Sequence, residues 1–160
     1  MEHERKWTIT GEHPVPSRFL SGGTEIEQFY VAIKPEREVR VRVRHYDSFT
    51  ERTLTVKTGT GEKRGEATIE IGEDDAKQLK RLREGQVIRK TRYANEGANG
   101  HVFEIDVYHN IDLPEGRAVV EIEDPPEDFL EPRWFGTEVT EDERFKNKNL
   151  VKWTTGSSDI

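Results

Sequence analysis

The sequence predicts an α+β fold in which eight mostly antiparallel strands close into a β-barrel, with helices packed on its outside. Apolar and charged residues alternate in many short segments: residues 39–44 read Val-Arg-Val-Arg-Val-Arg, residues 103–107 read Phe-Glu-Ile-Asp-Val and residues 120–123 read Val-Glu-Ile-Glu. Side chains of a strand alternate between its two faces, so each segment has one apolar and one charged face. Only two stretches have the spacing of a helix.

Eight segments have the alternation or the residue types of a strand. They lie near residues 2–9, 27–33, 38–46, 52–58, 64–71, 86–93, 102–108 and 117–123. Glycine-rich turn signals separate several of them, at residues 22–23, 59–61, 95–97 and 114–116. Short strands separated by such turns are typical of antiparallel sheets and barrels.

The first helix is predicted over residues 73–83. Either Asp74 or Asp75 is expected to cap it, because an aspartate side chain can accept a hydrogen bond from a free backbone N–H at a helix start. Its apolar positions recur every three residues, at Ala76, Leu79 and Leu82. This spacing predicts that one face of the helix packs against the sheet.

A second helix is predicted to begin at Thr140, and it would lie at one end of the barrel. Thr140 and Glu143 have the spacing of a capping box, in which each side chain satisfies a backbone donor of the first turn. The apolar residues of this helix are Phe145, Leu150 and Val151. Residues 154–160 are polar and are expected to form a frayed tail.

Length and composition narrow the class of protein. The chain has 160 residues, and one domain over residues 1–153 followed by the tail is the simplest organisation. A net charge of −7 argues against a nucleic-acid partner. There is no cysteine, and no apolar run long enough for a membrane span or a signal peptide, so a cytoplasmic protein without disulfides is expected.

The alternation alone leaves open which face of the sheet lines the inside of the barrel. If the apolar face were inside, the charges would form a solvated outer surface. If the charged face were inside, the lumen would hold like charges at neighbouring positions, which repel each other unless a ligand or a cation compensates them. The motifs along the chain favour the second arrangement.

Seven short motifs carry a resemblance. In chain order they are Glu2-x-Glu4-x-Lys6, Arg40-Val41-Arg42, Thr55-Val56-Lys57, Arg64-Gly65-Glu66, Lys90-Thr91-Arg92-Tyr93, Phe103-Glu104-Ile105-Asp106-Val107 and Val120-Glu121-Ile122-Glu123. A C-terminal segment, residues 134–147, completes the set. In this order the motifs resemble the CYTH superfamily, the triphosphate tunnel metalloenzymes, over residues 2–152. The likeness is closest to the short bacterial members that hydrolyse inorganic triphosphate.

The resemblance implies a metal site and a cationic substrate site. The expected ligands of Mg²⁺ or Mn²⁺, which prefer oxygen donors, are Glu2, Glu4, Glu121 and Glu123. The residues expected to bind the triphosphate are Lys6, Arg40, Arg42, Lys57, Arg64, Lys90, Arg92 and Lys146. Glu66, Glu104 and Asp106 are expected to support the basic side chains. Arg44 follows the same spacing, so the arginine pair is either Arg40 with Arg42 or Arg42 with Arg44.

The implied reaction is metal-dependent hydrolysis of inorganic triphosphate to diphosphate and phosphate. Glu4, Lys6 and Lys90 are the expected catalytic residues, with Glu4 positioning or deprotonating the attacking water. The alternatives are an adenylate cyclase or a thiamine triphosphatase on the same scaffold, or a polyphosphate-binding or nucleotide-binding module without turnover. The expected partner is a small-molecule triphosphate, with no nucleic acid and no membrane. A homodimer is a further expectation from the resemblance.

Overall fold

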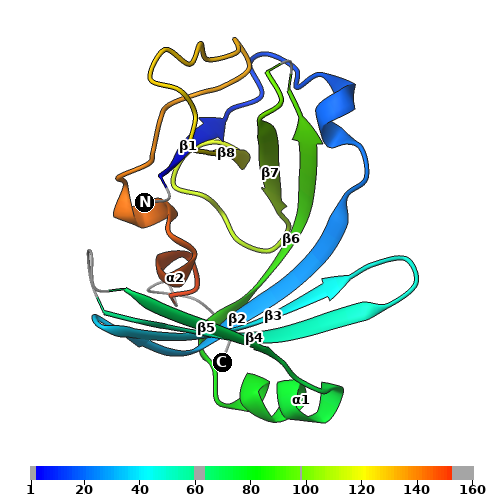
Figure 1. The fold of residues 1–160 in the computed structure, drawn as a ribbon, viewed down its shortest axis with the longest axis vertical. Coiled ribbons are helices and arrows are strands. Elements are labelled where there is room, and N and C mark those ends of the chain that lie inside the picture. Colours follow the sequence, from blue (N-terminus) through cyan, green and yellow to red (C-terminus); the bar gives the residue numbers. More distant parts are fainter. Residues whose placement is uncertain (1–2, 60–63, 98, 153–160) are drawn as a thin grey trace. The chain divides into compact units, whose positions relative to one another are not determined.

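The computed structural model describes residues 3–59, 64–97 and 99–152 (Figure 1). It confirms the α+β class, with eight strands and few helices in this part of the chain. The strands are β1 (Glu4–Ile9), β2 (Thr24–Lys34), β3 (Arg37–His45), β4 (Thr50–Thr58), β5 (Gly65–Glu70), β6 (Glu84–Glu96), β7 (Val102–Tyr108) and β8 (Ala118–Glu123). The helices are η1 (Ser17–Leu20), α1 (Glu73–Arg81), η2 (Glu143–Phe145) and α2 (Asn147–Leu150), of which η1 and η2 are 3₁₀ helices. The predicted tail, residues 154–160, lies outside the described residues.

The strands form one sheet in the order β1-β8-β7-β6-β2-β3-β4-β5. The ladders β1–β8, β7–β8, β6–β7, β3–β4 and β4–β5 are antiparallel, as predicted. β1 and β5 are the two end strands of this order, so hydrogen bonds among the described residues do not close the sheet. The predicted closed barrel is therefore not confirmed. None of the helices described has both the length and the apolar composition that a bilayer span needs.

The chain forms two compact units. Of the described residues, the first contains those within 3–25 and 90–146, and the second contains those within 26–89 and 147–152. β1, β7, β8, η1 and η2 belong to the first unit, and β3, β4, β5, α1 and α2 belong to the second. Each unit has one apolar face and one charged face on its strands.

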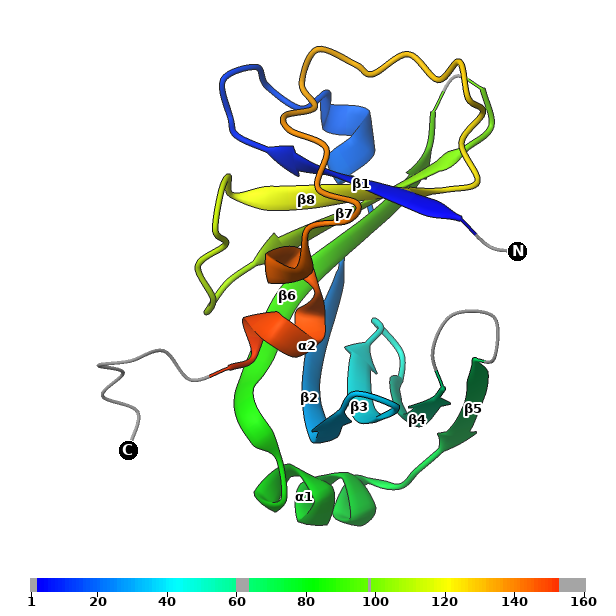
Figure 2. The same cartoon turned by 90° about the vertical axis from the view of Figure 1, so that its left-hand side faces the viewer.

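In the first unit, the apolar faces of β1, β7 and β8 form the core. Its buried residues are Trp7, Ile9, Phe19, Phe103, Ile105, Ala118, Val120, Ile122 and Trp134. The helix η1 and the segment that follows β8 lie over this face (Figure 2). Their aromatic rings pack into the core: the rings of Trp7 and Phe135 lie 4.9 Å apart, and those of Phe19 and Phe103 lie 5.0 Å apart. Trp7 and Trp134 are therefore core residues, 0% and 6% exposed.

The outer edge of β1 is covered by residues 136–139. Thr8 N donates to Thr137 O at 2.9 Å, and Val139 N donates to Lys6 O at 2.8 Å. Gly136 is needed for this close approach, because a Cβ atom there would lie 2.4 Å from Thr8 Oγ1. The segment that carries the predicted C-terminal signature is thereby fixed along the strand that carries Glu4 and Lys6.

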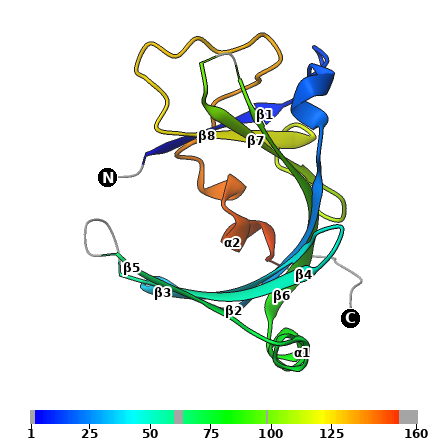
Figure 3. The same ribbon diagram turned by 45° about the vertical axis from the view of Figure 1, so that its right-hand side comes forward.

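In the second unit, α1 packs on the apolar face of the strands and α2 lies over the opposite face (Figure 3). The buried core consists of Phe29, Val41, Ala76 and Val87. The predicted helix 73–83 is thus confirmed as α1, but its details differ. Gly72 occupies the N-cap without a side-chain hydrogen bond, so the predicted Asp74 or Asp75 cap is wrong. Leu82 follows the last helical residue and is 65% exposed, so it does not join the apolar stripe.

The predicted capping box at Thr140 and Glu143 is also wrong. Thr140 Oγ1 accepts a hydrogen bond from Lys6 N at 3.0 Å and donates to Glu138 Oε2 at 2.7 Å. The hydroxyl is therefore engaged by β1, and the first helical turn begins three residues later as η2. Asp142 caps η2 by accepting from Arg144 N at 3.0 Å.

Candidate active site

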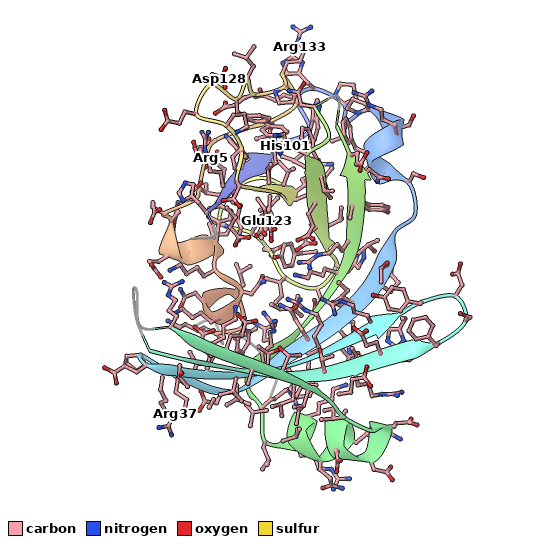
Figure 4. The ribbon with its side chains drawn as sticks, viewed as in Figure 1. Arg5, Arg37, His101, Glu123, Asp128 and Arg133 are labelled. Atoms are coloured by element: carbon pink, nitrogen blue, oxygen red, sulfur yellow. The ribbon has the colours of Figure 1, made fainter. Side chains whose placement is uncertain are left out.

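The charged face of the first unit brings together carboxylates from three strands. The register pairs Glu4 with Glu123 and Lys6 with Glu121 across β1 and β8, and it pairs Glu104 with Glu121 across β7 and β8. Residues opposite each other in an antiparallel ladder share a face, with Cβ atoms about 4.5–5.5 Å apart. Glu123 lies near the end of β8 (Figure 4). The predicted ligand Glu2 lies outside the described residues.

These carboxylates raise each other's affinity for protons. Glu4 is an exposed residue, but partial removal of its carboxyl from water and the charge of Glu121 raise the pKa of Glu4 to about 7. Burial, together with the charges of Asp106 and Glu121, also raises the pKa of Glu104. Lys6 compensates part of this charge, with Nζ 3.0 Å from Glu121 Oε1.

Oxygen donors held at close quarters with an excess of negative charge have the chemistry that hard divalent cations prefer. Among the described residues, however, no three His, Asp or Glu side chains converge in a geometry that could hold a metal ion. Glu4, Glu121 and Glu123, three of the four predicted ligands, have suitable donor chemistry, and their binding of a metal ion stays a prediction.

A buried ion network lies on the same face, between β6 and β7. The Lys90 side chain is fully buried, and its Nζ donates to Asp106 Oδ2 at 2.8 Å. Arg92 donates to both carboxylate oxygens of Asp106, from Nε at 2.8 Å and from Nη2 at 2.9 Å. Burial alone would raise the pKa of Asp106, but the two cations hold it well below its ordinary value. Arg92 also lies 3.4 Å from Glu104 Oε1. Asp106 and Glu104 therefore orient the two predicted phosphate-binding cations.

The charged face of the second unit carries the predicted arginines of β3. Arg42 is 9% exposed, and its Nε donates to Gln28 Oε1 on β2 at 3.0 Å. Arg44 lies on the same side but is ion-paired with Glu51 at 2.8 Å. The Arg44 charge is thus already paired at the hairpin end of β3. Which two of Arg40, Arg42 and Arg44 bind an anion stays a prediction.

The other predicted residues are more exposed. Lys57 lies opposite Glu66 in the ladder between β4 and β5, and both are exposed. Arg64 is exposed just before β5 begins. Lys146 follows η2 in the first unit, where its Nζ lies 2.8 Å from Glu143 Oε1 and its side chain is 43% exposed. Its predicted contact with the substrate stays a prediction.

Two residues of the second unit's charged face were missed by reasoning from the sequence. Gln28 is completely buried, and Tyr30 is 4% exposed. Burial raises the pKa of Tyr30, while a hydrogen bond from Arg40 and the charges of Arg40 and Arg42 oppose the rise. The sequence contains only a weak signal for these two residues. One amide and one phenol alternate with apolar residues, in a strand whose other residues resemble those of a buried core.

The chain is similar to two curated proteins along almost its whole length. It is 36% identical to the inorganic triphosphatase of Nitrosomonas europaea over 157 residues, which cover 94% of this chain and 96% of that protein. It is 37% identical to the inorganic triphosphatase of Acetivibrio thermocellus over 155 residues, which cover 94% of this chain and 93% of that protein. No family model matches the chain.

A solved structure agrees with these sequence relatives. The crystal structure of the inorganic triphosphatase NE1496 has a TM-score of 0.70 and 31% identity, and the match covers 96% of both chains. An antiparallel sheet with an apolar face and a face of lysines, arginines and carboxylates defines a class of proteins whose basic side chains suit an anionic ligand and whose carboxylates suit an accompanying cation. Within it, the chain belongs to the inorganic triphosphatase family, which confirms the resemblance to the CYTH superfamily.

Proposed function

We propose that this protein hydrolyses inorganic triphosphate to diphosphate and phosphate. The observation that carries the proposal is its identity of 36–37% to two inorganic triphosphatases over nearly the whole chain. The charged faces support it, because a triphosphate carries several negative charges and is bound best by guanidinium and ammonium groups. Closure of the eight strands around the substrate as a barrel remains a prediction of this proposal.

The cationic side chains have distinct roles in the proposed reaction. Lys90 and Arg92 are held in place by Asp106, so they are positioned before the substrate arrives. Lys6 is held by Glu121 and by a hydrogen bond to Phe145 O at 3.3 Å. Hydrolysis of a phosphoanhydride depends mainly on such positioning and on stabilisation of charge that develops on the leaving diphosphate.

Glu4 is the proposed base. Without a cation the pKa of Glu4 is raised to about 7 by burial and by the neighbouring carboxylates. A bound divalent cation would lower this pKa, so Glu4 would be ionised at physiological pH and able to accept a proton. Glu4, Glu121 and Glu123, with Glu2, would hold Mg²⁺ or Mn²⁺, which when bound would neutralise charge on the phosphate oxygens. Glu4 would then orient the attacking water and accept its proton.

A phosphate-release assay tests this proposal and separates it from its alternatives. Phosphate release from inorganic triphosphate, ATP and thiamine triphosphate is measured with Mg²⁺, with Mn²⁺ and with EDTA. We expect triphosphate to be hydrolysed fastest, and only with a divalent cation. Faster phosphate release from thiamine triphosphate would favour a thiamine triphosphatase, and formation of cyclic AMP and diphosphate from ATP, measured in the same reactions, would favour an adenylate cyclase. Binding without turnover under every condition would favour a non-catalytic module.

Triphosphate is expected to raise the melting temperature of the protein. Neighbouring arginines on β3 repel each other when no anion is bound, and a ligand that binds only the folded state stabilises it by mass action. Differential scanning fluorimetry over a series of triphosphate concentrations, in EDTA, should show a rise in melting temperature that increases with concentration. Equal sulfate concentrations control for general salt effects. A melting temperature that does not respond at millimolar triphosphate would contradict the cationic site.

The homodimer and the cytoplasmic location also remain predictions. Sedimentation velocity at several protein concentrations tests the first, and cell fractionation with a specific antibody tests the second. A monomer at all concentrations would remove the dimer from the proposal without affecting the reaction.

A further inference from the structure

The second unit contains two buried hydrogen-bond donors without a partner among the described residues. They are the amide Nε2 of Gln28 and the guanidinium Nε of Arg40. The great majority of buried polar atoms in folded proteins have a partner, and an exception calls for a ligand or a water molecule. Since neither atom can accept a hydrogen bond in its ordinary protonation state, any molecule that satisfies both must supply acceptors.

The orientation of the Gln28 amide follows from its neighbour. Arg42 Nε lies 3.0 Å from Gln28 Oε1. A guanidinium can only donate, so the atom that faces Arg42 must be the carbonyl oxygen of the amide. The opposite orientation would place two donors against each other. The unpartnered atom of Gln28 is therefore its NH₂ group.

The two donors belong to one surface. Gln28 and Tyr30 lie on β2, and Arg40 and Arg42 lie on β3, which is the neighbouring strand. Gln28 contacts Arg42, and Tyr30 accepts a hydrogen bond from Arg40, so all four side chains are on the same side of the sheet. Val41, between the two arginines, is in the apolar core on the other side.

We propose that Gln28 is a substrate-binding residue, whose amide NH₂ donates to a phosphoryl oxygen that Arg40 also binds. This inference rests on the proposed function and deepens it. A phosphoryl oxygen is acceptor-only when ionised, so it suits both unpartnered donors. At the same time the Gln28 carbonyl oxygen accepts from Arg42 and holds it in place. The Gln28 side chain would thus both position the Arg42 guanidinium and contact the triphosphate. Arg40 is only half-buried and has a long side chain, so its guanidinium can turn toward a phosphate that reaches this face.

The test compares two variants that each introduce a negative charge. The dissociation constant of inorganic triphosphate is measured by titration calorimetry in EDTA, and ³¹P NMR verifies that the triphosphate stays intact. Gln28→Glu keeps the acceptor for Arg42 but removes the donor. Thr53→Glu adds the same charge on β4, directly opposite Arg42 in the ladder, and leaves the amide unchanged. We expect the dissociation constant to rise at least tenfold more in Gln28→Glu than in Thr53→Glu. Equal losses in the two variants would overturn the inference.

A neutral variant guards against a folding defect caused by the buried charge. Gln28→Met has nearly the same shape and no donor, and we expect it to weaken triphosphate binding at least tenfold. In a double-mutant cycle with Arg40→Lys, which keeps the charge but lacks Nε, the two losses should be non-additive because both donors serve one phosphoryl group. Wild-type affinity in Gln28→Met would also overturn the inference.

The result remains separable from a failure of the proposed function. If the wild-type protein neither binds nor hydrolyses triphosphate, the proposed function is wrong. If it does both while Gln28→Met binds triphosphate as tightly as the wild type, only the role of Gln28 is wrong.

Discussion

Replacing Asp106 with asparagine is expected to lower the free energy of unfolding by about 3 kcal/mol, because removing one partner of a buried ion pair leaves a buried charge uncompensated. Lys90 is fully buried, and Asp106 is the carboxylate that both Lys90 and Arg92 contact at 2.8 Å. The asparagine side chain keeps only one acceptor oxygen in place of the two that accept from Lys90 and Arg92, and it carries no charge. For a domain of this size the loss corresponds to roughly 6–12 °C in melting temperature.

Urea unfolding measures this loss, and Glu70→Gln is the matched control because Glu70 is an exposed carboxylate on β5. Such a surface change usually costs within about 0.5 kcal/mol. The folded-state pKa of Asp106 is depressed, so its stabilising contribution is present above its ordinary value of 3.8 and is lost as the pH falls further. The difference between wild type and Asp106→Asn should therefore be constant from pH 5 to 8 and shrink below pH 4. A variant as stable as the wild type would contradict the network.

Glu4→Gln and Glu123→Gln are each expected to reduce metal-dependent triphosphate hydrolysis at least 100-fold, or about 2.7 kcal/mol of transition-state stabilisation. Both amides fill nearly the same space as the carboxylates but lose the charge that would hold a divalent cation. Glu4 also loses the proposed base. Phosphate release is measured over a series of Mg²⁺ and Mn²⁺ concentrations, with Glu127→Gln, an exposed change in the segment after β8, as the control. Wild-type rates at limiting metal in both variants would contradict the assignment.

The same variants give a readout of stability. The folded-state pKa of Glu4 is raised, so protonation of Glu4 favours the folded state, and this contribution is present at low pH and lost as the pH rises through about 7. In EDTA, Glu4→Gln should therefore melt at a higher temperature than the wild type at pH 8, and the difference should disappear toward pH 5. If Glu4→Gln instead melts below the wild type at pH 8, the crowding of carboxylates is not unfavourable.

The pattern of side chains along each strand could be predicted from the sequence. In residues 39–44 and 103–107 the alternation of charge with apolar residues depends only on the geometry of a single strand. The structure accordingly has Val41 and Ile105 in the cores and Arg42 and Asp106 on the charged faces. The order of the charged motifs along the chain was enough to indicate the family, because that order can be read from the sequence without knowing how the strands pair.

Partnerships between distant residues were decided by the tertiary structure. Thr140 has the local spacing of a helix cap, yet it is bonded to β1 because the backbone N–H of Lys6 needed an acceptor there. Gln28 has no motif, yet the neighbouring strand directs Arg42 toward its carbonyl. Local preferences are worth about 1 kcal/mol each, while an unsatisfied buried donor or an unpaired buried charge costs more. Where the two conflict, the partner across the sheet determines the position of the side chain.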